Sequence, residues 1–149
     1  MQADFERRHI DMQQTLSLNS HPQDAYRRQD ILTANSIDLV VMLYDALKKN
    51  LILGKRKIAK SDVEGAHRHL MKAQEIVTAL INSLDMNYEI SDNLFSIYEF
   101  ILRSAEEANT KKDSAPLEPL IEIVEDLRSA WDEIRTSVKG TMYMSEEQA

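Results

Sequence analysis

The sequence of 149 residues contains no cysteine, and it has only three glycines and three prolines. The absence of cysteine excludes disulfide bonds, thiolate metal sites and a cysteine nucleophile. Strand-rich domains need many turns, and turns rely on glycine and proline, so the scarcity of both argues against a β-rich fold. The abundant residues, among them Leu, Ala, Glu and Lys, favour helix instead. The composition therefore predicts a single all-helical domain.

Long apolar runs and an excess of positive charge are also missing. The longest apolar runs have four or five residues, whereas a membrane-spanning helix needs about 20. The first residues include Asp4 and Glu6 and lack the apolar stretch of a secretory signal. The net charge is −7, and nucleic-acid binding depends on clustered Lys and Arg. We therefore expect no membrane insertion, no secretory signal and no nucleic-acid partner.

Apolar residues recur at steps of three and four in four successive segments, which is the spacing of one helix face. These stripes span residues 40–58, 63–84, 90–108 and 117–138, and they include Val63 in the second, Ile90 in the third and Ile134 in the fourth. Short polar stretches separate the segments, and short connections place successive helices side by side in opposite directions. The sequence therefore predicts an all-α fold, an antiparallel four-helix bundle over residues 25–138. Residues 1–24 are expected to form a flexible N-terminal extension and residues 139–149 a frayed tail.

Polar and small residues mark the expected helix ends. Ser61 and Glu64 have the spacing of a capping box, which begins the second helix. Ser91 is expected to cap the third helix, and Gly140 to end the fourth. The basic group at residues 55–60 is expected to complement the negative end of the first helix.

No catalytic or metal-binding constellation is visible. Glu64 and His67 match one half of a di-metal site in a helix bundle, but such a site needs a second Glu-x-x-His pair. Of the other histidines, those at positions 21 and 69 have no glutamate three residues before them, and the pair Glu6 and His9 lies in the expected flexible extension, outside the bundle helices. A nucleophile elbow and a phosphate-binding glycine loop are also absent. The sequence predicts neither an enzyme nor a bound cofactor or metal.

The first predicted helix has more apolar surface than a four-helix bundle requires. Its core stripe is Val40, Leu43, Leu47, Leu51, Gly54 and Ile58. Beside this stripe lie two further apolar sets, which are Leu39, Met42, Ala46 and Leu53 on one side and Val41, Tyr44 and Ile52 on the other. An outer helix needs only one apolar stripe. The surplus predicts a groove for a partner helix. It is equally compatible with a cover formed by the chain's own segment around Tyr26, Ile31 and Leu32.

Several motifs occur in the order found in one known family. They are Ala25-Tyr26, Thr33-Ala34-Asn35-Ser36, Met42-Leu43-Tyr44-Asp45, Lys72-Ala73-Gln74-Glu75-Ile76, Ile97-Tyr98-Glu99-Phe100, Glu107-Ala108-Asn109 and Asp126-Leu127-Arg128-Ser129-Ala130-Trp131. With these motifs the chain resembles the flagellin-specific export chaperones of the FliS family, and the resemblance covers residues 25–138. The chain departs from the family pattern at Ser36, Ala46 and Phe100, where Pro, Gly and Tyr are frequent.

The resemblance implies a cytoplasmic chaperone that binds the disordered C-terminal segment of flagellin. Binding would block premature polymerisation and help delivery to the flagellar type III export apparatus. The client-binding residues are then expected to be Leu39, Met42, Leu43, Tyr44 and Ala46. Tyr26, Ile31 and Leu32 would form a displaceable N-terminal cover, with Tyr26 also a candidate for contact with the cytoplasmic domain of the export gate. Tyr98 and Trp131 are expected in the core. The alternative is a helical module for a different flagellar or secretion client.

Overall fold

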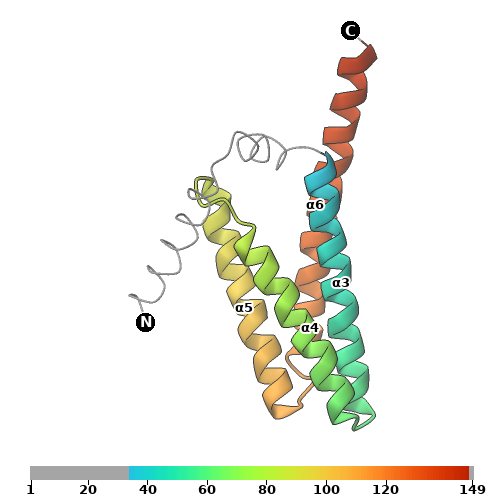
Figure 1. Cartoon of the computed structure of the whole chain (residues 1–149), viewed down its shortest axis with the longest axis vertical. Helices are drawn as coiled ribbons and strands as arrows, with labels where there is room; N and C mark the ends of the chain where they lie inside the picture. Colours follow the sequence, from blue (N-terminus) through green and yellow to red (C-terminus); the bar gives the residue numbers. More distant parts are fainter. Residues whose placement is uncertain (1–33, 148–149) are drawn as a thin grey trace.

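The computed structural model describes residues 34–147, which form four helices labelled α3 to α6 (Figure 1). Helix α3 spans Ala34–Ala59, α4 spans Val63–Asn82, α5 spans Glu89–Lys111 and α6 spans Leu117–Glu147. The predicted all-α bundle of four helices is confirmed over this range. None of these four helices is apolar over a length that would cross a membrane.

Consecutive helices run in opposite directions, since short connections join them (Figure 1). Helix α3 packs against both α4 and α6, and α4 also packs against α5. Helices α5 and α6 approach each other much less closely than the other neighbouring pairs. The bundle is therefore built around α3, and its seam between α5 and α6 is the loosest.

The core is formed by the inward faces of all four helices. Its largest fully buried side chains are Tyr44, Tyr98, Ile37, Leu47, Leu51, Leu70, Leu80, Ile101, Leu117, Leu120, Val41 and Val77. The predicted core of α4 is confirmed at Ala66, Leu70, Ala73, Val77 and Leu80.

In α3 the predicted core face was partly wrong. Val41 and Tyr44 are buried, whereas Val40 and Leu43 are only partly buried. The prediction failed because α3 is apolar around more than half of its circumference, and apolar spacing alone cannot select which side faces the core.

Three predicted helix ends differ from the structure. Asp62, not Ser61, caps α4, because its carboxylate accepts a hydrogen bond of 2.9 Å from the backbone N–H of Gly65. Ser91 lies inside the first turn of α5, where its hydroxyl donates to the carbonyl of Asp85. Helix α6 continues through Gly140 to Glu147. A single glycine costs a helix only about 1 kcal/mol relative to alanine, so it does not by itself end one.

Ion pairs line the contact between α3 and α6, and their signs reverse along the helices. Near the start of α3, Asp38 lies 3.5 Å from Arg135 and 3.4 Å from Lys139, and Asp45 pairs with Arg128 at 2.5 Å. Further along, the basic side chain belongs to α3: Lys48 lies 2.7 Å from Glu125, and Lys55 pairs with Glu118. The pattern matches only the antiparallel pairing of these two helices.

Candidate functional site

Large apolar side chains are exposed on the face of α3 that points away from the core. Leu39 is 57% exposed and Met42 is 65% exposed. Ala46 and Leu53 follow at helical spacing and are partly buried. We call these four residues the α3 strip. Exposed apolar surface on one helix face is typical of a site for a partner helix.

The structure separates the five predicted client-binding residues into three environments. Leu39 and Met42 are open to solvent, whereas Leu43 and Ala46 are partly buried against the core. Tyr44 is 0% exposed. Placing Tyr44 on an open groove was therefore wrong, because its side chain points into the bundle. The predicted cover residues Tyr26, Ile31 and Leu32 lie outside the described residues.

Tyr44 forms a polar contact across the core with Tyr98. The two hydroxyl groups are hydrogen-bonded, and the ring centroids lie 6.4 Å apart. Burial raises the pKa of the Tyr44 hydroxyl far above its ordinary value, and the neighbouring Tyr98 raises it further, while a hydrogen bond from Trp131 acts in the opposite direction. Burial also raises the pKa of Tyr98. Both groups stay neutral, and they join α3 to α5 beneath the α3 strip.

Tyr98 and Trp131 were both predicted to lie in the core, and the structure buries only one of them fully. Tyr98 is 2% exposed, so its prediction is confirmed. Trp131 is partly buried and packs against the edge of the core.

Among the described residues, six large apolar side chains outside α3 are also exposed: Val63, Met71, Tyr88, Ile90, Phe100 and Ile134. Three of them were predicted to belong to core stripes, but Val63 is 58%, Ile90 61% and Ile134 44% exposed. Phe100 is 55% exposed. Ile90 and Phe100 belong to α5 and Ile134 to α6, the two neighbouring helices that approach each other least. Apolar spacing alone cannot show which members of a stripe stay exposed to solvent, so these exposures were not predicted.

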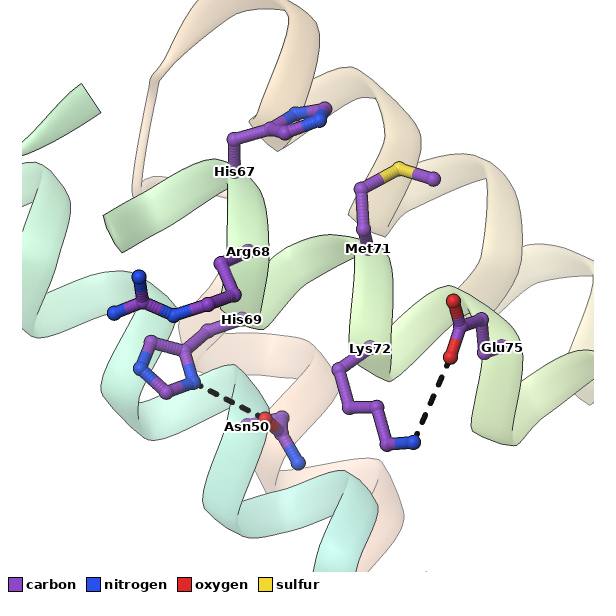
Figure 2. A pocket seen from close by; sticks show the side chains of 7 residues that line it. All are labelled: Asn50, His67, Arg68, His69, Met71, Lys72 and Glu75. Atoms are coloured by element: carbon purple, nitrogen blue, oxygen red, sulfur yellow. Dashed lines mark hydrogen bonds and ion pairs between the residues drawn. The ribbon is translucent and has the colours of Figure 1, made fainter. Parts of the chain in front are cut away.

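A shallow hollow of about 610 Å³ lies over α4 beside α3 (Figure 2). It is lined by Asn50, His67, Arg68, His69, Met71, Lys72 and Glu75. His69 Nδ1 lies 3.2 Å from Asn50 Oδ1, and this contact joins α4 to α3. The pKa of His69 is lowered, first by burial and then by the positive charges of Arg68, Lys57 and Lys49. Lys72 and Glu75 in the hollow form an ion pair, so Arg68 supplies its net positive charge.

His67, which matched half of a metal site in the sequence, contacts an amide side chain in the structure. His67 Nδ1 lies 3.1 Å from the side-chain amide of Asn109 on α5. Within residues 34–147 no three His, Asp or Glu side chains are grouped as a metal site would require. The described surface offers apolar contact and charge, which suit the binding of a polypeptide.

Comparison with known proteins assigns a family. The family model described as flagellar protein FliS matches residues 19–138. The chain is 32% identical to the flagellar secretion chaperone FliS of Bacillus subtilis over 111 residues, which are 74% of this chain and 84% of the relative. It is 33% identical to the protein of the same name from Vibrio cholerae, over 64% of this chain and 72% of the relative. The same name is carried by a Salmonella typhimurium relative, 26% identical over 70% of this chain and 79% of that protein. The chain therefore belongs to the FliS family of flagellar secretion chaperones.

Proposed function

We propose that this export chaperone binds the disordered C-terminal segment of flagellin in the cytoplasm. It prevents premature polymerisation and aids delivery of flagellin to the flagellar type III export apparatus, with no enzymatic step. The observation that carries the proposal is the α3 strip, because Leu39 and Met42 expose apolar side chains that an amphipathic client helix would bury. Family membership supports the export role.

Leu39 and Met42 make the main client contacts in this proposal. Leu43 and Ala46 form the floor of the same surface, since both are partly buried against the core. Tyr44 holds α3 in place from within the bundle. A client that folds on binding loses conformational entropy, which offsets part of the gain from apolar burial. Such a balance suits a chaperone that must release its client at the export apparatus.

The test of client binding is calorimetry with a peptide of the last ~40 residues of the cognate flagellin. We expect one-to-one binding with a negative heat-capacity change, which marks burial of apolar surface. If this peptide does not bind, flagellin is not the client, and the alternative of another flagellar or secretion client takes its place.

The Met42→Glu variant tests the position of the surface. We expect the affinity for the peptide to fall at least tenfold, because the variant loses about 1.5–3 kcal/mol of apolar burial and must also desolvate a carboxylate. Helical content should stay unchanged by circular dichroism, since Met42 is 65% exposed. Ser129→Glu, at an exposed position on α6, is the matched control and should bind like the wild type. Equal affinity in Met42→Glu and the wild type would remove the α3 strip from the client site.

We further infer that Tyr26, Ile31 and Leu32 cover the α3 strip when no client is bound, and that Tyr26 contacts the cytoplasmic domain of the export gate. The cover is tested by deleting residues 1–32. The truncated protein should bind an environment-sensitive apolar dye more strongly, because Leu39 and Met42 lose their cover. Unchanged dye fluorescence would contradict the cover. Tyr26→Ala in the full chain should weaken binding of the export-gate domain to the chaperone–flagellin complex.

A further inference from the structure

The outward face of α3 changes from apolar to basic along its length. Met42 is followed at helical spacing by Ala46, Lys49, Leu53, Arg56 and Lys60. Lys49, Arg56 and Lys60 are all exposed. A ligand that lies along this face for roughly 30 Å would meet apolar side chains at one end and cations at the other.

Helix α4 adds to the basic end of this face. The contact of 3.2 Å between His69 and Asn50 holds α4 against α3 next to Lys49. The positive charges of Arg68, Lys57 and Lys49 all act on His69, so cations from both helices lie around this contact between α3 and α4. Figure 2 shows Arg68 beside His69, on the side of α4 that faces α3.

Half of the cations in this region have no ion-pair partner among the residues that the structure describes. Residues 48–72 contain eight Lys or Arg and only two acidic residues, Asp62 and Glu64. Four of the eight are paired: Lys48 with Glu125, Lys55 with Glu118, Lys57 with Asp62 and Lys72 with Glu75. Among the ion pairs of the described residues, none involves the exposed side chains of Lys49, Arg56, Lys60 or Arg68.

Helix dipoles account for only part of the cluster. Arg56 lies in the last turn of α3, where positive charge is stabilised by the negative helix end. Lys49 lies ten residues before that end, and the dipole acts only over the terminal turn. Arg68 lies in the second turn of α4, near the end where a dipole favours negative charge. The helix dipoles therefore do not explain the positions of Lys49 and Arg68.

We propose that Lys49, Arg56, Lys60 and Arg68 bind an acidic stretch of the same client segment whose apolar part lies on Leu39 and Met42. This inference rests on the proposed function and adds the chemistry of the client. The bound segment is an amphipathic helix that is apolar at one end and carries carboxylates at the other. The charges fix its direction along α3, since the reversed segment would place carboxylates on the apolar end and leave the cations unpaired.

The experiment compares three full-length proteins as binders of the C-terminal flagellin peptide, at 50 and 300 mM salt. They are the wild type, the double variant Lys49→Glu with Arg68→Glu, and the control Lys111→Glu. Lys111 is exposed and pairs only with Glu107 of its own helix among the described ion pairs. We expect the double variant to lose at least tenfold in affinity at 50 mM salt. The loss should shrink at 300 mM, because salt screens exposed charges, and the control should bind like the wild type.

A charge swap in the peptide completes the test. Replacing one acidic cluster of the peptide with lysine should weaken binding to the wild type and restore binding to the double variant. Equal affinity of double variant and wild type would overturn this inference while leaving flagellin as the client. Failure of the wild type to bind the peptide would instead overturn the proposed function. Salt-dependent self-association of the wild type that the double variant lacks would assign the cations to a second copy of the chain and overturn the inference.

Discussion

The hydroxyl groups of Tyr44 and Tyr98 share one hydrogen bond inside an otherwise apolar core. A buried hydroxyl that loses its partner costs about 1–3 kcal/mol, whereas removing both partners costs less than the sum of the two single losses. This pair therefore specifies how α3 and α5 face each other, in addition to its contribution to stability.

We expect Tyr44→Phe to lower the free energy of unfolding by about 1–3 kcal/mol, because it leaves the Tyr98 hydroxyl unpaired. Tyr98→Phe should act in the same direction but less strongly, because Trp131 still donates a hydrogen bond to the Tyr44 hydroxyl. The double variant should be more stable than the sum of the two single losses predicts. Urea denaturation of the four proteins measures this coupling. Tyr88→Phe, at a position that is 44% exposed, serves as the control. Additive losses would mean that the hydroxyl contact contributes nothing.

His69 links stability to pH. Its pKa is lowered from the ordinary value of 6.5, first by burial and then by neighbouring cations. Below about pH 6.5 the unfolded chain takes up a proton that the folded protein resists, so the wild type loses stability as the pH falls until the folded pKa is passed. We expect His69→Gln to remove this contribution. The difference in unfolding free energy between the wild type and the variant should therefore change between pH 7.5 and 5, to the disadvantage of the wild type. A constant difference over that range would contradict the lowered pKa.

At the scale of one element, α3 packs so closely on α4 that a glycine is needed at the contact. A Cβ atom added at Gly54 would lie 2.6 Å from Leu70 Cδ2 and 2.9 Å from Leu70 Cγ. Leu70 is fully buried, so it has little room to move. Gly140 in α6 is the opposite case, since nothing lies within 4 Å of its added Cβ.

We expect Gly54→Ala to destabilise the protein by about 1–3 kcal/mol through overpacking, in spite of the better helix propensity of alanine. Gly140→Ala is the matched control and should stabilise the helix by up to about 1 kcal/mol. Thermal unfolding of both variants measures the two shifts, which should have opposite signs. Stabilisation of both variants would show that Leu70 can move aside.

The order of charges along α3 and α6 specifies how these two helices pair. Exposed ion pairs contribute little individually, but Asp45 and Lys48 lie on one helix with opposite charges, and their partners on α6 are reversed in sign. A parallel pairing would bring Asp45 towards the acidic end of α6 and Lys55 towards its basic end. The reversal therefore disfavours the wrong orientation more than it stabilises the correct one.

At the scale of the whole molecule, the helix number and connections were predictable because four long apolar stripes alternate with short polar segments. The rotation of α3 about its own axis was not predictable, because apolar residues on several sides leave more than one face that could point inward. Only packing against Leu70 and Tyr98 selects one of these faces. A helix end was predicted wrongly where two neighbouring residues can both act as the N-cap, as Ser61 and Asp62 can at the start of α4. The strip at Leu39 and Met42 was found from the surplus of apolar residues, whereas the burial of Tyr44 depends on its partner 54 positions away.

Helix α3 has a different neighbour on almost every side: the core within, α4 and α6 beside it, and the proposed client outside. Selection for folding and selection for client binding therefore act on different positions of this helix, and the two can be measured separately. A library of α3 substitutions sorted for folding should tolerate change at Leu39, Met42 and Lys49, whereas the same library sorted for motility should not. Positions that differ between the two sorts would outline the client's footprint without any structure of the complex.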